Sequence, residues 1–441
     1  MTTFDAPAPA APLPLRRAQP FFIQIPSAIW FLGRDRDYWR LMIRGVALLA
    51  VTLGIYRFWL TTDQRRFLWS NTEILGQTLE YTGTAREILI GFLVAIAILV
   101  PIYGLIFLAT LDLGLIGSLA GIIGFVLLSL LGQFAVYRAR RYRLTRTIYR
   151  GMRFHQTGSA TAFALYALLW WVLVVLTLGL VYPWAQAGIE RFKMRNTYLG
   201  NLQGRFEGSG GRLFREGFVL WLVTVGPIVL GLVIFATQLD FKLLEDIAAN
   251  ITNEDELKRI FTDNAGILVL LAFGASLLTW PLMTGFLLYP VFQAITMRWW
   301  ASGLRFGDVA AKSSLRVGQV YGAYLGFLGW TSLVSIMGSF VAAIVAVLVL
   351  GVGTATKFFE DAGNLETVGV AGAIGGVMLY VILALVYSAT YHVKLKLAVW
   401  RMVAQSIDLT NAGTLDTVSS VGAPASPVGE GLADALSVGG Y

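Results

Sequence analysis

Cysteine is absent from the 441 residues, and histidine occurs only twice, at His155 and His392. Disulfides, thiolate metal sites and cysteine nucleophiles are therefore excluded, and so is a histidine-rich metal site. Charged residues make up only 14% of the chain, whereas a soluble domain typically carries about 25%. Because a surface that faces water needs charge, this shortage indicates a surface that faces lipid.

Long runs without Asp, Glu, Lys or Arg account for much of the chain. They cover residues 88–111, 113–137, 217–239, 264–297, 317–356 and 367–393. Each is longer than the roughly 20 residues with which an α-helix crosses a bilayer. Strands of a membrane barrel would instead be about 10 residues long with alternating polarity, and these runs do not alternate. The sequence predicts an all-α, polytopic membrane protein with about six full spans.

Positive charge predicts the orientation of these spans, because Lys and Arg favour cytoplasmic loops. Residues 138–153 hold seven arginines and no acid, and residues 191–215 hold six basic residues. Residues 240–263 hold seven acids against three bases, and 357–366 hold a single lysine. We therefore expect the first two segments, and both chain ends, to be cytoplasmic, and the last two segments to lie outside.

Two further apolar stretches, 41–60 and 161–183, have basic sequence on both sides. Only 12 residues separate Arg44 from Arg57, which corresponds to about 18 Å of helix at 1.5 Å per residue. That length favours a re-entrant or interfacial helix for 41–60. The stretch 161–183 is long enough to cross, so the same assignment and a short full span both remain open for it.

The two short stretches begin an internal repeat with an offset of 125 residues. Positions 52–83 and 177–208 are identical at nine of 32 ungapped positions, where composition alone gives about two. Repeats in membrane proteins often meet at a pseudo-symmetric site, although duplication also simply adds helices. The repeated positions are Thr52, Gly54, Trp59, Arg66, Asn71 and Gly83, with Thr177, Gly179, Trp184, Arg191, Asn196 and Gly208.

The domain organisation follows from these patterns. Residues 1–27, rich in Pro and Ala, and residues 409–441, rich in Gly, Ser, Ala and Val, read as disordered cytoplasmic tails. The membrane domain between them, 28–408, contains repeat units at about 41–112 and 161–239 and a looser echo at 266–408.

The motif residues also carry a family resemblance. The runs Tyr38-Trp39-Arg40-Leu41, Thr52-Leu53-Gly54-Ile55-Tyr56, Asn71-Thr72 and Tyr81-Thr82-Gly83, with Trp59, Arg65 and Arg66, resemble the YjgN-type family of bacterial inner-membrane proteins. The resemblance extends over roughly residues 28–408. It implies a bacterial inner-membrane location and no particular activity, since the domain is one of unknown function.

No motif points to an enzyme or to a cofactor. The expected spans contain no titratable side chain except His392, whereas catalytic sites and proton-driven transporters need such groups inside. A P-loop is absent as well. We therefore expect no catalytic residues, metal or cofactor.

Two functions remain open from the sequence: passive or substrate-gated transport or lipid handling, and a non-transporting scaffold that binds anionic lipids or partner proteins. A net charge of +8, placed beside apolar runs, indicates the anionic membrane surface rather than nucleic acid. The residues expected to contact anionic phospholipid are Arg138, Arg140, Arg141, Arg143, Arg146, Arg150, Arg153, Arg191, Lys193 and Arg195.

Overall fold

The computed structural model of the protein describes residues 24–25, 28–111, 114–350 and 369–419. Most of the two predicted tails and the predicted outer loop 357–366 lie outside these residues. The sequence predicts tails at residues 24–25 and 409–419, which are described: 24–25 and 409–410 belong to strands, and 412–417 form a 3-10 helix.

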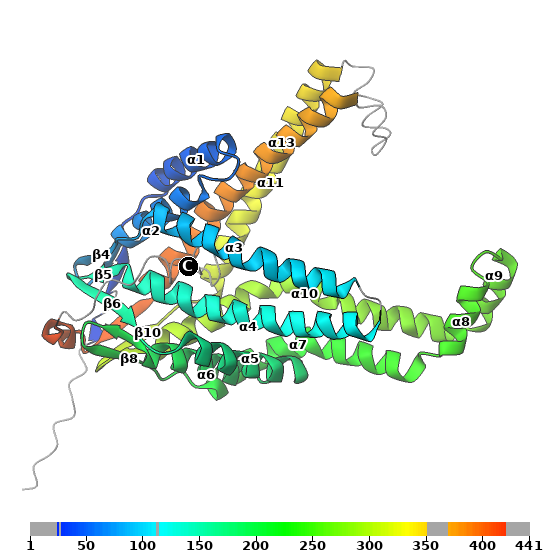
Figure 1. Ribbon diagram of the computed structural model, residues 1–441, viewed down its shortest axis with the longest axis horizontal. Helices are drawn as coiled ribbons and strands as arrows, with labels where there is room; N and C mark the ends of the chain where they lie inside the picture. Colours follow the sequence, from blue (N-terminus) through cyan, green and yellow to red (C-terminus); the bar gives the residue numbers. More distant parts are fainter. Residues whose placement is uncertain (1–23, 26–27, 112–113, 351–368, 420–441) are drawn as a thin grey trace, which may run out of the picture.

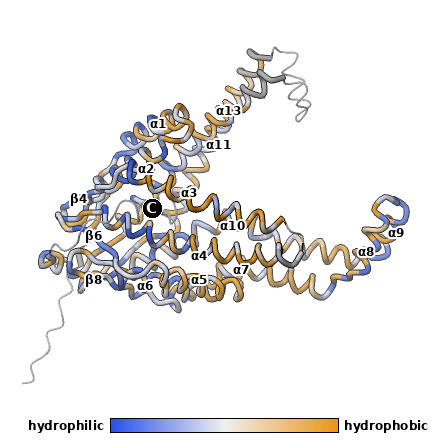
Figure 2. Tube along the Cα trace, in the orientation of Figure 1, coloured by the Kyte–Doolittle hydropathy of each residue, from blue (hydrophilic) through white to orange (hydrophobic). Residues whose placement is uncertain are grey.

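Six of the described helical segments are long and apolar enough to cross a membrane, as the sequence predicts. Many of their apolar side chains are exposed, including Phe125 at 74% and Leu282 at 81%, and Figure 2 shows the apolar colour along these helices. A large exposed apolar surface marks contact with a membrane or with another protein, and the length of these helices fits a membrane. The segments are α3 (Ala85–Thr110), α4 (Leu115–Thr145), α7 (Gly210–Gln238), α10 (Ala265–Gly303), α11 (Val317–Leu350), and α13 (Gly369–Thr390) continued by η2 (Tyr391–Lys396) and α14 (Leu397–Gln405).

The long helices pair as hairpins: α3 packs on α4, α7 on α10, and α11 on α13. In Figure 1 the α11 and α13 pair leans away from the other two pairs. The short helices α8 (Phe241–Ala249) and α9 (Glu254–Asp263) lie at the far end of α7 and α10 and carry the predicted acidic loop. The basic segments lie at the opposite end of the hairpins, and Figure 2 shows hydrophilic colour at both ends with apolar helices between them.

The two short apolar stretches form helical hairpins of their own. Helix α1 (Asp35–Val51) turns into α2 (Arg57–Ser70), and α5 (Ala160–Leu176) turns into α6 (Tyr182–Arg195). Both hairpins leave from a strand and return to a strand of the same sheet.

A sheet of antiparallel strand pairs joins the helical hairpins, so the all-α prediction is wrong in this respect. The sheet runs in the order β1-β11-β10-β9-β8-β7-β6-β5-β4-β3-β2. Its strands have at most five residues and include arginine and glutamate, so they lack the long apolar periodicity that reveals an element in sequence. They are β1 (Gln24–Ile25), β2 (Ile29–Phe31), β3 (Thr72–Ile74), β4 (Gln77–Tyr81), β5 (Thr147–Tyr149), β6 (Met152–Gln156), β7 (Thr197–Leu199), β8 (Leu202–Phe206), β9 (Leu304–Phe306), β10 (Val309–Ser313) and β11 (Ile407–Thr410).

The sheet curls on itself because its two edge strands, β1 and β2, are neighbours in the chain. Gln24 pairs with Thr410 while Phe31 pairs with Thr72. One face gathers a shared apolar core from strands along the whole order, including Tyr149. The sheet is therefore a small, filled, barrel-like hub, and each helical hairpin is inserted between two of its strands.

The C-terminal segment covers this hub. The 3-10 helix η3 (Ala412–Thr417) follows β11, and Leu415 packs into the core of the sheet. Asp416 forms an ion pair with Arg150 at 2.5 Å. The backbone N–H of Ser419 bonds to the side-chain oxygen of Asn201 at 3.1 Å.

Candidate functional site

The two Thr-Leu-Gly turns are built by the same hydrogen bonds. The hydroxyls of Thr52 and Thr177 each donate to the carbonyl oxygen four residues earlier, at 2.7 and 2.8 Å, and accept the N–H four residues later, at 3.0 and 3.3 Å. Gly54 and Gly179 have φ angles of 93° and 84°, a region in which any residue with a Cβ is strained. Each turn is therefore a helix end followed by a left-handed reversal.

Two arginines of the motif tie the returning helices to the chain ahead of the next span. Arg66 Nη2 donates to the carbonyl oxygen of Gly83 at 3.1 Å, and Arg191 Nη2 donates to that of Gly208 at 3.0 Å. A Cβ at either glycine would lie within 2.5 Å of the aromatic side chain two residues earlier. A side chain at either glycine would therefore clash with the neighbouring aromatic ring, and the glycine carbonyl oxygens hold the two arginines in place.

The remaining motif positions end the helices or face outward. Asn71 and Asn196 cap the C-termini of α2 and α6, and their side-chain amides donate to the carbonyl oxygen four residues earlier at 2.7 and 2.8 Å. Trp59 and Trp184 are 36% and 41% exposed.

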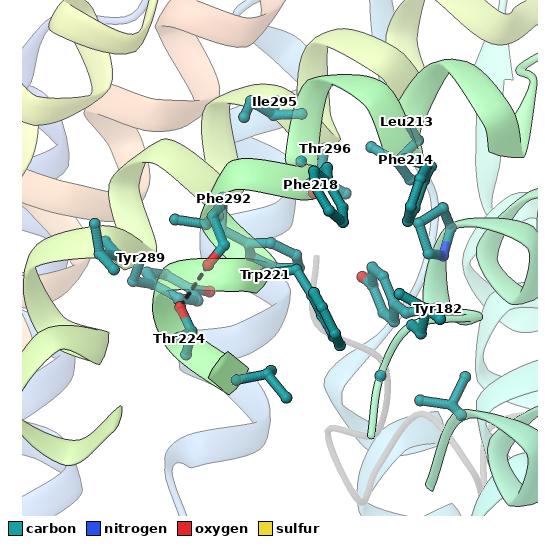
Figure 3. A pocket seen from close by; sticks show the side chains of 18 of the residues that line it. Tyr182, Leu213, Phe214, Phe218, Trp221, Thr224, Tyr289, Phe292, Ile295 and Thr296 are labelled. Carbon is teal, nitrogen blue, oxygen red and sulfur yellow. Dashed lines mark hydrogen bonds between the residues drawn. The ribbon is translucent and has the colours of Figure 1, made fainter. Parts of the chain in front are cut away.

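An apolar groove of about 340 Å³ lies where the second turn meets α7 and α10 (Figure 3). The turn contributes Gly179 and Tyr182, α7 contributes Trp221, and α10 contributes Phe292. The indole nitrogen of Trp221 donates to the carbonyl oxygen of Leu178 at 2.9 Å. This bond holds the turn of the short hairpin against a full span.

Two glycines keep the groove open. Gly217 and Gly285 line it from α7 and α10, and a Cβ at either position would meet no described atom within 4 Å. The same two helices touch directly farther from the sheet, where a Cβ at Gly231 would lie 2.8 Å from the carbonyl oxygen of Gly274. The groove therefore lies on the sheet side of this close contact.

Few polar atoms face the groove. The Thr224 hydroxyl already donates to an α7 carbonyl oxygen at 2.8 Å, and the buried Thr296 hydroxyl has no hydrogen-bond partner among the described residues. The rings of Tyr182 and Tyr289 lie 5.7 and 6.3 Å from that of Phe292. A hydrocarbon chain suits such a lining better than a hydrated solute, since a polar group buried without partners is unfavourable.

Most of the basic residues predicted to contact anionic lipid are bonded inside the protein. Arg140, at the end of α4, donates to Gln156 Oε1 at 2.9 Å and to Thr197 Oγ1 at 2.7 Å. Arg146 is buried and pairs with Glu87 at 3.0 Å. These two arginines join α4 to neighbouring strands and to α3.

Others of the same segment also bond to the protein. Arg141 donates to a carbonyl oxygen in the loop before α5, Arg153 to a carbonyl oxygen at the end of α4 at 2.6 Å, and Arg150 to the C-terminal segment. Arg138 and Arg143 are half-buried. Arg150 is the exposed residue among these five.

On α6 two of the three predicted basic residues are exposed, and the third is half-buried in an ion pair. Arg191 and Arg195 are exposed, whereas Lys193 bonds to Glu190 at 2.8 Å and the Trp300 indole donates to the same carboxylate at 3.1 Å. Burial opposes ionisation of Glu190, but Lys193 and its other donors outweigh burial and hold the pKa of that carboxyl below its ordinary value of 4.5.

The sequence alone does not single out the groove. Its aromatic residues on α7, Phe214, Phe218 and Trp221, recur at a spacing of three and four, which puts them on one helix face. That spacing is common to every packed helix, so it does not distinguish a groove from a core.

Comparisons with known proteins agree with the membrane architecture. A family model described as "Bacterial protein of unknown function (DUF898)" matches residues 26–435. The chain is 26% identical to the inner membrane protein YjgN of Escherichia coli strain K12 and 27% identical to that of strain O157:H7. Each alignment covers 151 residues, 34% of this chain and 35% of the relative, so about a third of each relative is matched. No solved structure matches the chain.

Proposed function

The chain belongs to the DUF898 family of bacterial proteins, which includes the YjgN-type inner-membrane proteins, and we propose that it binds membrane phospholipid. One acyl chain occupies the apolar groove formed by the α5–α6 turn, α7 and α10. The observation that carries this proposal is the groove's lining, which is almost entirely apolar and is kept open by Gly217 and Gly285.

We propose that both short hairpins are re-entrant and are copies of one unit. Helix α5 has 17 residues, about 26 Å at 1.5 Å per residue, and its hairpin begins and ends at the sheet. In the first hairpin the turn residue Leu53 is 94% exposed, which favours a tip in contact with lipid. A re-entrant second hairpin puts the groove at a depth where acyl chains are present.

We also propose that the sheet and both termini are cytoplasmic and that α8 and α9 lie outside. The Lys and Arg asymmetry of the loops supports this orientation. The sheet then lies at the inner surface of the membrane, where the anionic headgroups are.

The groove favours lipid handling over transport of a water-soluble solute, because a hydrated solute needs polar partners. A scaffold that works through residues 138–153 has less support. Arg140, Arg146 and Arg153 bond within the protein, so their charge is partly used to hold the fold together.

Filling the groove tests the proposal. The variants Gly217→Leu and Gly285→Leu place a side chain in space that is open in the structure, and leucine is a better helix former than glycine. We expect both proteins to fold and to lose crosslinking to a phospholipid with a photoreactive group in its acyl chain. The matched control is Gly104→Leu, at a span glycine where a Cβ also meets no described atom within 4 Å but which is outside the groove. Equal crosslinking of all three variants and the unsubstituted protein would contradict the proposal.

A further inference from the structure

Each re-entrant hairpin carries a polar cavity on the side where its two helices meet the basic end of the protein. The cavity of the α5–α6 hairpin has about 390 Å³ and that of the α1–α2 hairpin about 480 Å³. Both cavities are lined by arginine residues, whereas the lining of the apolar groove contains none. Arg191 and Arg195 line the first cavity, and Arg40, Arg44 and Arg66 line the second.

The two cavities are formed by corresponding residues. Six residues that line the α1–α2 cavity are each matched by the residue 125 positions later, which lines the α5–α6 cavity. These six are Leu41, Gly45, Asp63, Arg66, Phe67 and Ser70. Two cavities that share so many positions are a property of the repeated unit rather than a packing accident at one place.

The shared arginine is held in place in both cavities. Arg66 and Arg191 each bond to a glycine carbonyl oxygen through one nitrogen, which fixes the guanidinium and leaves its other N–H groups available. Both side chains are exposed. A planar, fixed guanidinium is the group best suited to phosphate oxygens.

Each cavity keeps an excess of positive charge. Arg195 lies over the Phe192 ring at 4.6 Å and adds a second guanidinium to the α5–α6 cavity. In the α1–α2 cavity Asp63 offsets one of three arginines. Both cavities therefore retain two more positive than negative side chains among their described lining residues.

The surroundings of the cavities indicate headgroup depth. Trp184 borders the α5–α6 cavity and is 41% exposed, while Leu165 and Leu169 on the adjoining helix are 57% and 66% exposed. In the other hairpin Ile43 is 61% exposed beside Arg44. Exposed apolar side chains directly beside exposed arginines are expected where hydrocarbon meets phosphate.

We propose that these two cavities bind the phosphate groups of anionic phospholipids, one at each hairpin. This inference rests on the proposed lipid-binding function, and it assigns the headgroup class that the apolar groove does not select. The ligand phosphate comes from a lipid rather than from a soluble compound, because the cavities border apolar surface.

The test uses the two exposed arginines that are least involved in the fold, in the variants Arg195→Gln and Arg44→Gln. Proteins are placed in nanodiscs that contain phosphatidylglycerol and phosphatidylethanolamine, and the bound lipids are identified by native mass spectrometry. We expect each variant to bind phosphatidylglycerol about five-fold more weakly, since one basic residue near an anionic surface contributes roughly 1 kcal/mol. Binding of phosphatidylethanolamine should fall less, because the ammonium group of that lipid offsets the charge of its phosphate.

Three controls make the outcome decisive. Arg215→Gln removes an exposed arginine of α7 that lines neither cavity, and an equal loss of phosphatidylglycerol in this variant would overturn the proposal. Arg195→Lys keeps the charge and should recover most of the binding. Inorganic phosphate at millimolar concentration should not displace the lipid, and displacement would show that soluble phosphate is the ligand and overturn the lipid assignment.

The groove variant Gly217→Leu separates this inference from the proposed function. If the groove binds lipid and the cavities do not select it, Gly217→Leu reduces all lipids while the arginine variants keep the original lipid composition. That result would overturn the inference and leave the proposed function standing. If the arginine variants lose phosphatidylglycerol and Gly217→Leu changes nothing, the cavities are supported and the groove is not.

Discussion

The guanidinium of Arg191 donates a hydrogen bond to the carbonyl oxygen of Gly208 at 3.0 Å. This bond joins the end of α6 to the loop that starts α7, across the strands β7 and β8. The pair Arg66 and Gly83 makes the same bond at 3.1 Å across β3 and β4. In both places a short hairpin and the span that follows it are fastened on opposite sides of one β-hairpin.

We expect Arg191→Gln to destabilise the protein by about 1 kcal/mol, which is typical of a lost hydrogen bond at a partly solvated site. Thermal unfolding of the protein in detergent measures the effect as a lower midpoint. Arg66→Gln should give a similar shift, because its geometry is the same. Arg215→Gln is the matched control and should leave the midpoint unchanged; an equal decrease there would mean that the effect is one of charge alone.

The turn glycine Gly179 should be sensitive to alanine. Its φ of 84° puts a Cβ close to the backbone, so Gly179→Ala should reduce the free energy of unfolding by roughly 1–2 kcal/mol. Gly54→Ala should behave in the same way. Gly104→Ala, inside a span helix, should keep or raise the unfolding midpoint, since alanine favours the helix. A tolerated alanine at both turns would mean that the turns rearrange at little cost.

Glu190 should make stability depend on acid pH. Its pKa in the folded protein lies below the ordinary value of 4.5, because Lys193 and other donors outweigh burial. The stabilisation is therefore fully present above about pH 4.5, where the unfolded chain is ionised too, and is lost as pH falls through the lower folded pKa.

Unfolding midpoints measured between pH 3 and pH 7 check this expectation. Glu190→Gln should flatten the acid side of the profile, and Glu256→Gln, on the exposed helix α9, should not. Parallel profiles for the unsubstituted protein and Glu190→Gln would show that this carboxyl makes no such contribution.

The chain's lack of cysteine makes its orientation simple to measure. A cysteine introduced as Lys258→Cys in α9 should react in intact cells with a maleimide that penetrates the outer membrane but not the inner one. Gln77→Cys, exposed on β4, should react only after the inner membrane is permeabilised. The reverse pattern would place the sheet outside and contradict the cytoplasmic assignment.

Much of the helical architecture could be predicted, because a membrane-spanning helix is recognised from its length and hydropathy alone. The apolar runs around Phe125 and Leu282 could be identified as helices without knowing which other segments they contact. The sheet could not be predicted in this way: β5 and β6 join at Arg150 and Gly151, which both have positive φ angles, and the strands on either side have three and five residues. The arginines in this segment are typical of a cytoplasmic loop, so the sequence did not indicate strands there.

The candidate sites were predictable only in part, since they join residues far apart in the sequence. The offset of 125 residues pairs Arg66 with Arg191, and the two side chains make matching bonds to glycine carbonyl oxygens. The offset does not reveal the cavities around them. The groove needs Gly179 to meet Trp221 and Phe292, and nothing in the composition of α5, α7 or α10 specifies that meeting.

The pairing of β1 with β11 constrains how the protein is made. Gln24 is synthesised long before its pairing partner Thr410. All the helical hairpins between the two residues are synthesised before that pair can form. Until then the growing chain contains an incomplete sheet with two unpaired edge strands. Unpaired edge strands can form hydrogen bonds with strands of other chains. A ribosome that stalls after the last span would leave a chain whose membrane helices are complete and whose hub is still open.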